Sequence, residues 1–355
     1  MATMLNGAAI MDAALLLIAA NEPFPQPQTL EHLKAVEIMK LRNLIILQNK
    51  IDLVGEVHAQ DQYDKIRAYI DSTIGLNMPI IPISAQLKRN IDYLLEYLCH
   101  MPLPMRQLKC PARMTVVRSF DINKPGEVDI ENLRGGVARM TVVRSFDINK
   151  PGEVDIENLR GGVAGGTVTQ GIIRVNQVVE IRPGQVHTQT GGTFSCTPLR
   201  TRALTLKAED NSLQYAIPGG LIAVGTTLDP TLTRQDKMVG HMIGDEGSLP
   251  QVYAEIEVQY FLFSEMVGRS KQRDRNAKRV QKLNLQETLQ INVGTLTAGA
   301  TVVNITKNPD IAKLTLVTPV CCTMGEQVAI SRLVEKNFRL IGWGTIRRGA
   351  PVKLN

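Results

Sequence analysis

The sequence contains few cysteines and few aromatic residues, and this scarcity excludes several classes of protein. Its 355 residues include five cysteines, with no C-x-x-C pair, one tryptophan and 4% aromatic residues in all. An odd, scattered set of cysteines argues against a disulfide framework and against a zinc site. The five histidines show no metal-binding spacing either, so we expect no metal site. This usage fits a reducing, cytoplasmic compartment.

Long apolar runs are also absent. The run "AALLLIAA" at 13–20 is too short to cross a bilayer and lacks the basic flank of a signal peptide, so we expect no membrane partner. Charged residues make up 21% and hydrophobic residues 44%, which is typical of a globular protein with ample core. The net charge of +6 includes Lys/Arg clusters at 269–282 and 331–355. Each cluster indicates either an anionic partner or an ordinary solvated face.

The N-terminal region, residues 1–104, alternates apolar runs with helical patterns. The helical patterns place apolar residues on one stripe and separate three β-prone runs. The expected strands lie at 13–20, 43–48 and 79–84, and the expected helices at 25–41, 59–72 and 90–101. Such alternation predicts a parallel sheet with helices on its faces.

The pattern changes after a proline-punctuated linker at 101–111. From residue 112 onward, short β-branched runs are separated by Gly, Pro, Asn and Asp. This spacing is typical of antiparallel barrels. We expect one barrel over 105–230 and a second over 231–355. The predicted fold class is therefore an α/β domain followed by two antiparallel β-barrels.

A block of 26 residues occurs twice without a single difference. The stretch "ARMTVVRSFDINKPGEVDIENLRGGV" occupies 112–137 and again 138–163. Repeat architectures use several units whose copies diverge, so two identical neighbours indicate a recent duplication or an assembly error. A barrel can use one copy of this strand, and we expect the other to be a non-functional excursion. The sequence leaves open which copy fills the strand.

Polar residues follow two of the expected strands in the N-terminal region. The residues concerned are Asn49, Lys50, Ile51 and Asp52 after one strand and Ser84, Ala85 and Gln86 after the next. Open α/β sheets bind ligands at the carboxyl ends of their strands. A carboxylate at position 52 can accept hydrogen bonds from both N1–H and the 2-amino group of guanine. Adenine lacks this donor pair, so the carboxylate would select the base.

The neighbouring residues can complete such a site. Asn49 can tie the loop and reach N7, the Lys50 stem can cover the base, and backbone N–H groups of 84–86 can meet O6. Alone, N-K-x-D also fits an ordinary loop or helix cap. Together with S-A-Q at the end of the next strand, it favours a guanine site.

The phosphate half of a nucleotide site is missing from the sequence. No G-x-x-x-x-G-K-[ST] motif occurs, so no loop is present to wrap phosphate oxygens or to help hold magnesium. The D-x-x-G match at 52–55 uses an Asp that already belongs to the base motif. Because charge-assisted bonds to phosphate are the strong ones, we expect these residues alone neither to hydrolyse nor tightly to bind GTP.

The motifs resemble the translational GTPases, and more closely the gamma-subunit family of eukaryotic translation initiation factor two. The likeness rests on "IILQNKIDLV", "IIPISAQLKRNID", "VRSFDINKPG", "LQYAIPGGLIAVGT" and "EKNFRLIGWGTIRRG", among others along the chain. The family implies a G domain followed by two barrels, with GTP/GDP and Mg as cofactors. It implies a GTP-dependent carrier of methionyl initiator tRNA to the small ribosomal subunit, with guanine contacts at residues 49–52 and 84–86.

The resemblance also implies partners and shows departures. In the family, the alpha subunit docks on the first barrel, the beta subunit on the G domain, and an assembly chaperone handles the segment matching 342–354. The phosphate loop, both switches, a zinc-knuckle insertion and the histidine that positions the attacking water precede the position of Met1. We therefore expect a partial G domain from a truncated sequence, and leave GTPase activity open. The strand at 13–20 would then be an apolar sheet edge.

The C-terminal region contains candidate tRNA contacts and bears on the alternative functions. Arg347 and Arg348 are candidates for phosphate contact, although solubilising charge on a strand end explains them as well. We expect Trp343 to be a packing residue. A non-enzymatic fragment that binds the alpha subunit or RNA is the main alternative to the tRNA carrier. An elongation-type factor is a third possibility, which "RLIGWGTIRRG" disfavours.

Overall fold

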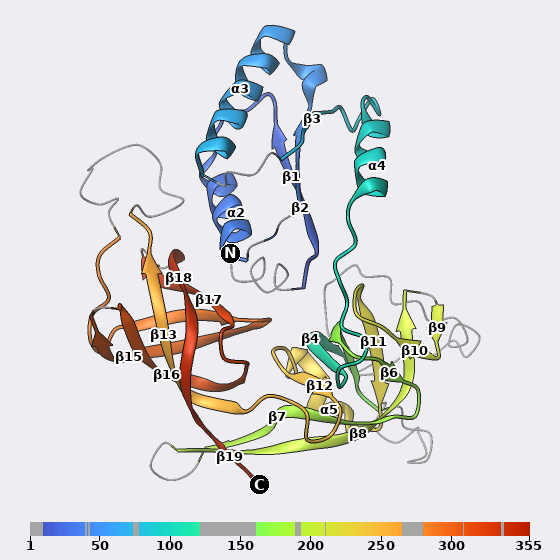
Figure 1. Cartoon of the computed structure of the whole chain (residues 1–355), viewed down its shortest axis with the longest axis vertical. Coiled ribbons are helices and arrows are strands. Elements are labelled where there is room, and N and C mark those ends of the chain that lie inside the picture. The colour runs from blue at the N-terminus through green and yellow to red at the C-terminus, as the bar shows by residue number, and fades with distance from the viewer. Residues whose placement is uncertain are drawn as a thin grey trace.

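The computed structural model describes residues 10–39, 41, 43–73, 78–120, 161–188, 193–209, 211–264, 280–307, 309–334 and 337–355. It consists of an α/β part and two barrels, which lie side by side beneath it in Figure 1. The predicted fold class is confirmed. No helix in these ranges is long and apolar enough to cross a membrane.

The α/β part is a parallel sheet of three strands in the order β1-β2-β3. The strands are β1 (Ala13–Ala19), β2 (Asn43–Asn49) and β3 (Ile80–Pro82). The helices are α2 (Pro27–Ile38), α3 (Glu56–Thr73) and α4 (Ile91–His100). Proline opens α2 because its missing N–H is not needed in the first turn.

The two faces of this sheet are covered unequally. One face packs side chains such as Leu16 and Ile46 against buried residues of α2 and α3. On the other face, the described buried residues that pack with α4 come from β2, β3 and the position just after β3. Leu15 and Leu17 of β1 are therefore 42% and 56% exposed. Within the described residues β1 pairs with β2 alone, as expected of an apolar edge strand.

The first barrel closes through the strand order β11-β5-β4-β12-β7-β8 and a further pairing of β11 with β8. Its strands are β4 (Arg113–Phe120), β5 (Val163–Gln170), β7 (Val178–Thr188), β8 (Phe194–Ala208), β11 (Ile222–Thr226) and β12 (Met242–Gly244). Minor elements are β6 (Ile173–Arg174), β9 (Asn211–Leu213), β10 (Tyr215–Ala216), α5 (Pro230–Thr233) and the 3-10 turn η4 (Arg234–Asp236). Because β12 pairs with β4 and β7, this barrel extends beyond the expected boundary at 230.

The first copy of the duplicated block supplies a barrel strand. β4 lies wholly within 112–137, whereas Val163, the last residue of the second copy, begins β5. Phe120 and Val163 are partners in the β4–β5 ladder. The intervening residues 121–160 lie outside the described part of the chain, so the expectation of an idle second copy stays a prediction.

The second barrel closes in the order β13-β16-β15-β14-β17-β18. Its strands are β13 (Val252–Leu262), β14 (Thr288–Val293), β15 (Leu296–Thr306), β16 (Ile311–Cys321), β17 (Gln327–Val334) and β18 (Asn337–Pro351). Side chains that alternate along these strands fill one apolar core. The C-terminal β19 (Lys353–Leu354) leaves this barrel and pairs with β8 of the first barrel.

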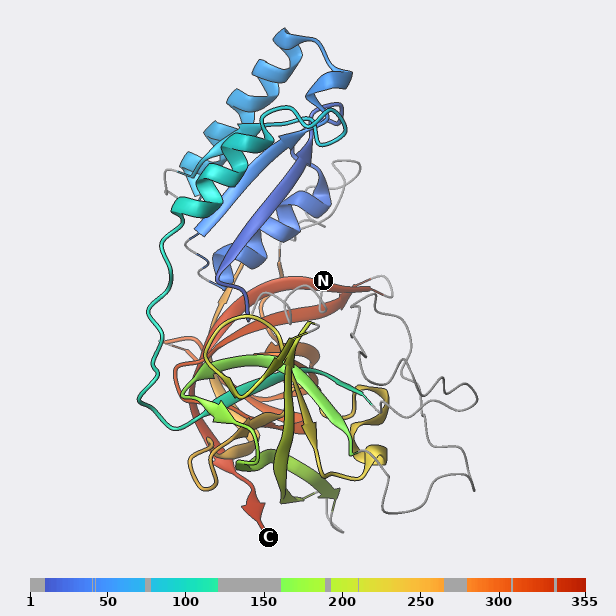
Figure 2. The same cartoon turned by 90° about the vertical axis from the view of Figure 1, so that its right-hand side faces the viewer.

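The α/β part contacts the second barrel through α2 and reaches the first through an extended segment. Ala35 and Ile38 of α2 pack against Ala329 and Leu340 of the barrel. An ion pair of 2.9 Å between Arg339 and Glu31 lies at the same interface. Figure 2 shows the extended segment that runs from the end of α4 down to β4. The α/β part is thus tied to both barrels.

Candidate guanine-base site

The two predicted base loops meet at one edge of the sheet. Asn49 is the last residue of β2, and Ser84 follows shortly after β3. The strands are parallel neighbours, so their carboxyl ends lie side by side. The backbone joins the loops further, since Ile51 N–H donates to the Ile83 carbonyl at 3.4 Å.

Asn49 ties the two loops together. Its Oδ1 accepts from Lys50 N–H at 2.8 Å and from Ala85 N–H at 3.1 Å. Lys50 adopts a left-handed backbone with φ of 66°, which turns the chain sharply out of the strand. This geometry agrees with the expected tying role of Asn49.

Asp52 lies in a short 3-10 helix, Ile51–Leu53, and its side chain is exposed. Ser84 is buried, and its Oγ accepts from Leu87 N–H at 3.2 Å, which shapes the second loop. Ala85 and Gln86 are exposed beside it. The structure thus brings both loops together with a free carboxylate at the rim. Binding of guanine by these residues stays a prediction.

Two buried amides that sequence analysis missed hold this edge in place. Gln48 donates to Gln62 Oε1 at 2.9 Å and to the Ala59 carbonyl at 2.8 Å. Gln62 in turn donates to the carbonyls of Ala19 and Glu22, at 3.0 and 2.7 Å. A glutamine inside the apolar run "NLIILQ" was the available signal, because a buried polar side chain needs partners.

The described residues beside the base loops do not form a metal site. The described residues contain no group of three or more His, Cys, Asp and Glu side chains placed to hold a metal ion. Magnesium in phosphate sites is usually held by carboxylates together with phosphate oxygens. The described residues at this edge therefore do not form a magnesium site by themselves.

The candidate tRNA residues Arg347 and Arg348 lie in β18, near its C-terminal end. Arg347 occupies a β-bulge, because the ladder pairs Arg348 with Glu257 and Ile346 with Val258. The bulge lets two consecutive arginines both be exposed. Arg347 Nε donates to Gln259 at 2.9 Å.

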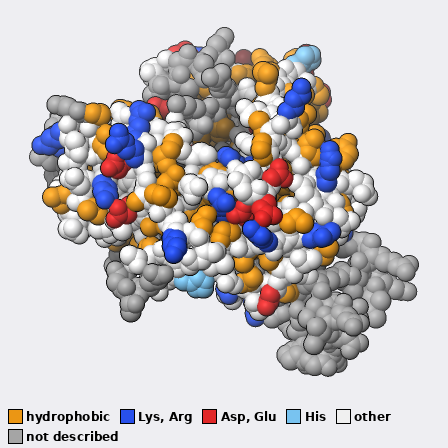
Figure 3. Space-filling model, turned by 60° about the horizontal axis from the view of Figure 1, so that its bottom comes forward, with side chains coloured by type: hydrophobic (Ala, Val, Ile, Leu, Met, Phe, Trp, Pro, Cys, Tyr) orange, Lys and Arg blue, Asp and Glu red, His pale blue; other side chains and the backbone are white. Residues whose placement is uncertain are grey.

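Trp343 stacks on Phe261, with ring centroids 4.7 Å apart, and packs with the interface cluster under α2. The prediction of a packing role for this side chain agrees with these contacts. On the face of the barrels shown in Figure 3, Lys and Arg side chains lie interspersed with Asp, Glu and hydrophobic ones. This described face therefore carries no patch of one sign.

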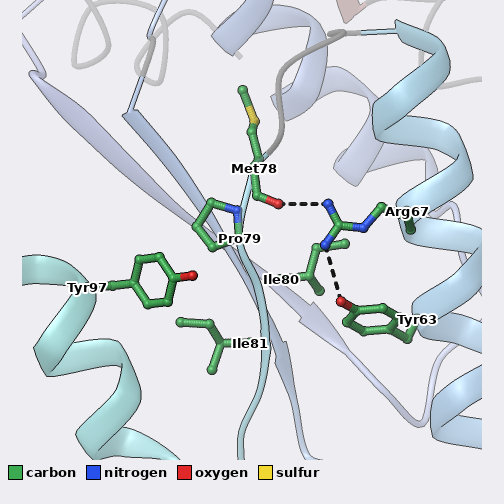
Figure 4. Close-up of a pocket in the computed structure, with 7 residues that line it drawn as sticks. All are labelled: Tyr63, Arg67, Met78, Pro79, Ile80, Ile81 and Tyr97. Carbon is green, nitrogen blue, oxygen red and sulfur yellow. Dashed lines mark hydrogen bonds between the residues drawn. The ribbon is translucent and has the colours of Figure 1, made fainter.

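A cavity of about 260 Å³ lies at the opposite end of the sheet from the base loops, beside the start of β3 (Figure 4). Arg67 crosses it and donates to the Met78 carbonyl at 2.9 Å and to Tyr63 Oη at 3.2 Å. Tyr97 of α4 forms the far wall. The large apolar or aromatic residues of α4 that stay exposed are Tyr93, Leu95, Tyr97 and Leu98. The surface of α4 thus carries four exposed apolar or aromatic side chains.

Comparisons with known proteins agree with this arrangement. A model of the elongation factor Tu GTP-binding domain matches residues 1–103, and a model of the C-terminal part of initiation factor eIF2 gamma matches 254–346. Two solved structures of translation elongation factor SelB from Methanococcus maripaludis share the fold at 18% and 19% identity. Their TM-scores are both 0.69, over 98% and 99% of this chain and 68% and 69% of theirs. The fold and the base loops define a GTP-binding domain of the translation-factor type followed by two barrels.

Two relatives of higher sequence identity identify the family within this class. The chain is 47% identical to eukaryotic translation initiation factor 2 subunit 3 of Drosophila melanogaster, over 99% of its length and 68% of that protein. It is 46% identical to eukaryotic translation initiation factor 2 subunit gamma of Schizosaccharomyces pombe, over 100% of its length and 73% of that protein. The chain belongs to the gamma-subunit family of eukaryotic translation initiation factor 2.

Proposed function

We propose that this chain acts in translation initiation as the subunit that carries methionyl initiator tRNA to the small ribosomal subunit. It would do so in the cytoplasm, in response to GTP and together with the alpha and beta subunits. The observation that supports this most directly is the meeting of the loops 49–52 and 84–86 at one sheet edge. A chain that responds to GTP must distinguish guanine from adenine, and these loops offer the groups for that.

A substitution at Asp52 tests this proposal, because it should change which base the chain prefers. An exposed carboxylate can accept from N1–H and the 2-amino group of guanine. Asp52→Asn replaces one acceptor oxygen with a donor, so the preference should move from guanine to xanthine nucleotides, which carry a carbonyl at C2. NMR shift changes at residues 49–52 and 84–86, with nucleotide at millimolar concentration, measure this. Asp71→Asn, an exposed carboxylate on α3, is the matched control and should keep the guanine preference.

Nucleotide affinity should be weak in a polypeptide of these 355 residues. The sequence holds no G-x-x-x-x-G-K-[ST] motif, and the residues described at the base edge do not fit magnesium. Charge-assisted bonds to phosphate supply much of the affinity for a nucleoside triphosphate. Titration of a fluorescent guanine nucleotide should therefore give a Kd well above about 1 μM. Micromolar or tighter binding, or measurable GTP hydrolysis, would contradict this expectation.

Contact with tRNA is proposed for Arg347 and Arg348 on β18. The bulge presents both guanidinium groups to solvent, where they can reach phosphates. Charge reversal of both residues to Glu should weaken initiator-tRNA binding and flatten its salt dependence. Reversal of Arg200 and Arg202 on β8 changes the net charge equally and serves as the control. If both double variants lose the same tRNA affinity, the loss comes from net charge, which would count against a tRNA site on β18.

We propose that another subunit binds where apolar side chains are exposed. We place the beta subunit on the α/β part at the Figure 4 cavity and α4, and the alpha subunit on the first barrel. Tyr97→Glu should abolish co-purification with the beta subunit, because it puts a charge into the apolar contact. Glu96→Ala, on the same helix, should leave it intact. If the Tyr97 variant still binds the beta subunit, the cavity is not part of the interface.

A non-enzymatic subunit- or RNA-binding protein is the alternative. The exposed apolar face of α4 and the absence of a phosphate-loop motif favour it. It predicts that the alpha and beta subunits bind with and without GTP alike. A GTP-dependent gain in initiator-tRNA affinity, measured on the assembled subunits, supports the carrier instead. Under either function, the segment 342–354 is where we place contact with an assembly chaperone.

A further inference from the structure

Among the described residues, arginines that are buried or half-buried lie close to carboxylates, and Arg67 is the exception. A charge that is taken out of water needs an opposite charge or hydrogen bonds to compensate it. The ion pairs that provide this are Arg106–Asp12, Arg118–Asp236, Arg182–Glu180, Arg332–Glu287 and Arg339–Glu31. Arg113 has no such pair, but its charge opposes the increase in the pKa of Glu326 that burial causes. Arg67 is half-buried and forms no ion pair in the described part of the chain.

Arg67 has two acidic neighbours on its own helix, yet it pairs with neither. Asp64 precedes it by three residues of α3 and Asp71 follows it by four, a spacing that brings helical side chains together. Arg67 instead crosses the cavity beside β3 and donates to the Met78 carbonyl at 2.9 Å and to Tyr63 Oη at 3.2 Å (Figure 4). Both acceptors are neutral. They satisfy hydrogen bonds of the guanidinium but leave its positive charge in the cavity without a counter-ion.

The other polar side chains of the cavity can also donate hydrogen bonds. Tyr63 Oη accepts from Arg67, so its own O–H remains to donate. Tyr97 of α4 forms the far wall, and its hydroxyl points toward β3 in Figure 4. Neither hydroxyl donates to another described residue. The Met78 carbonyl, which is an acceptor, is already used by Arg67. A positive charge surrounded by unused donors is the chemistry that binds a carboxylate.

The size and walls of the cavity fit one side chain better than a whole small molecule. Its volume of about 260 Å³ is below the roughly 300–1,000 Å³ that is usual for small-molecule sites. Pro79, Ile80 and Ile81 line it with apolar surface. Tyr93 lies one turn before Tyr97 on α4 and is exposed, so the apolar surface continues outside the cavity. A polypeptide that lies over α4 can therefore place one acidic side chain in the cavity.

We propose that the cavity binds the carboxylate of one Asp or Glu side chain of the beta subunit. This inference rests on the function proposed above, which places that subunit at the cavity and α4. The carboxylate accepts from the Arg67 guanidinium and from the hydroxyls of Tyr63 and Tyr97, while apolar residues beside it in the partner cover Tyr93. Arg67 thereby selects the segment that docks, because a neutral or basic side chain in the cavity would leave the guanidinium buried without a counter-ion.

Arg67 also has a structural role, which must be separated from binding. Its guanidinium lies 5.7 Å from the centre of the Tyr63 ring, and its bond to Met78 ties α3 to the chain just before β3. Loss of these contacts alone would lower the stability of the α/β part without changing how the affinity for a partner depends on salt. Loss of a charge pair with the partner changes both the affinity and its salt dependence. The salt dependence of binding therefore distinguishes the two roles.

The variant Arg67→Gln tests the proposal, because it removes the charge and keeps an amide donor. Titration calorimetry of the full chain with the purified beta subunit, at several salt concentrations, measures its effect. We expect the affinity at low salt to fall about 10-fold to 100-fold and its dependence on salt to decrease. Lys65→Gln, at an exposed residue of the same helix that pairs with Asp61, removes the same charge and is the control. Equal affinity and equal salt dependence in the parent and Arg67→Gln would overturn the proposal.

Substitutions in the partner give an independent test, which does not require Arg67→Gln to fold. Each Asp and Glu of the beta subunit is changed in turn to Asn or Gln and titrated against the parent chain. One of these variants should lose about 10-fold to 100-fold in affinity. In a double-mutant cycle, its loss and that of Arg67→Gln should not add. If no single acidic residue of the partner weakens binding, or if every pair of losses adds, the proposal is wrong.

The variant Tyr97→Glu separates this proposal from the function on which it rests. If Tyr97→Glu binds the beta subunit as the parent does, that subunit does not bind at the cavity, and both the location and the carboxylate contact are wrong. If Tyr97→Glu loses binding while Arg67→Gln keeps the affinity and salt dependence of the parent, the location holds and only the carboxylate contact is refuted.

Discussion

The second barrel and the α/β sheet bury apolar strands in opposite ways. In the barrel every strand has two hydrogen-bonded neighbours, so no strand edge is left open. In the sheet, β1 has one neighbour within the described residues, and Leu15 and Leu17 remain exposed on its uncovered face. Closure makes the barrel self-sufficient. The sheet depends instead on the segments that pack against it. The polar groups of the two regions also differ.

The interior of the second barrel is packed with apolar side chains, whereas buried amides hold the edge of the sheet. Alternating side chains of all six strands fill the barrel interior. The edge of the sheet that carries the base loops is instead held by Gln48 and Gln62, which bridge two strands and α3. Apolar packing tolerates small adjustments in position, but hydrogen bonds fix direction. The edge of the sheet where we predict a base site is therefore the part held by hydrogen bonds.

The largest effect is expected inside the closed barrel. Leu314 on β16 is fully buried, so Leu314→Ala should lower the free energy of unfolding by about 2–5 kcal/mol. Val317 on the same strand is 66% exposed, and Val317→Ala should stay within about 0.5 kcal/mol. Urea unfolding measures both. Similar losses at the two positions would mean that the barrel surface is covered in solution.

The next effect is expected at the buried amides. Gln62→Ala removes the donor to the Glu22 carbonyl and one of two partners each of the Ala19 carbonyl and the Gln48 amide, and should cost about 1–3 kcal/mol. It should also speed hydrogen exchange of the loop 49–52. Gln60→Ala, two residues away on the same helix and exposed, removes only a surface bond to Asp64 and is the control. An unchanged loop in the Gln62 variant would refute its positioning role.

Sequence patterns sufficed for most of the strands. The runs at 13–20 and 43–48 are continuous and apolar, as expected of strands in a parallel sheet, and they coincide with β1 and β2. The runs of the second barrel alternate as a closed barrel requires. The base loops were also accessible from sequence, because their residue types fall at strand ends.

Other features were not accessible, for identifiable physical reasons. β12 is three residues long, "MIG", and nothing local separates it from a loop. Its strand character comes from pairing with β4 and β7, more than fifty residues away along the chain. The Gln48–Gln62 bond likewise joins a strand to a helix, and only the tertiary fold brings them together. Such long-range pairs leave no periodic signal.

A smaller effect is expected from acid, which should lower the stability of the first barrel through His241. His241 lies just before β12 in the first barrel, and its Nε2 donates to the Gly184 carbonyl at 3.2 Å. Burial lowers the pKa of His241 below its ordinary value, which outweighs the opposing effect of that bond. The folded protein therefore keeps His241 neutral where the unfolded chain, with a pKa near 6.5, takes up a proton. Stability is full above about pH 6.5 and falls as the pH drops toward the folded pKa.

The variant His241→Gln isolates this contribution. It keeps a donor for the Gly184 carbonyl but cannot titrate, so other groups are matched between the two proteins. Below about pH 6.5 the parent should lose stability relative to the variant by up to about 1.4 kcal/mol per pH unit. Urea unfolding at several pH values measures the difference. Parallel pH profiles would show that His241 is solvated.

The smallest effect on stability is expected at the open edge of the sheet. Leu17 of β1 is 56% exposed, so Leu17→Lys should change the free energy of unfolding by no more than about 0.5 kcal/mol. A lysine on an edge strand opposes pairing with another chain, so self-association in sedimentation velocity should decrease. Leu16→Lys, on the buried face of the same strand, should instead unfold the sheet. If Leu17→Lys proves as damaging as Leu16→Lys, this face of β1 is covered in the native protein, and the contrast between open sheet and closed barrel does not hold.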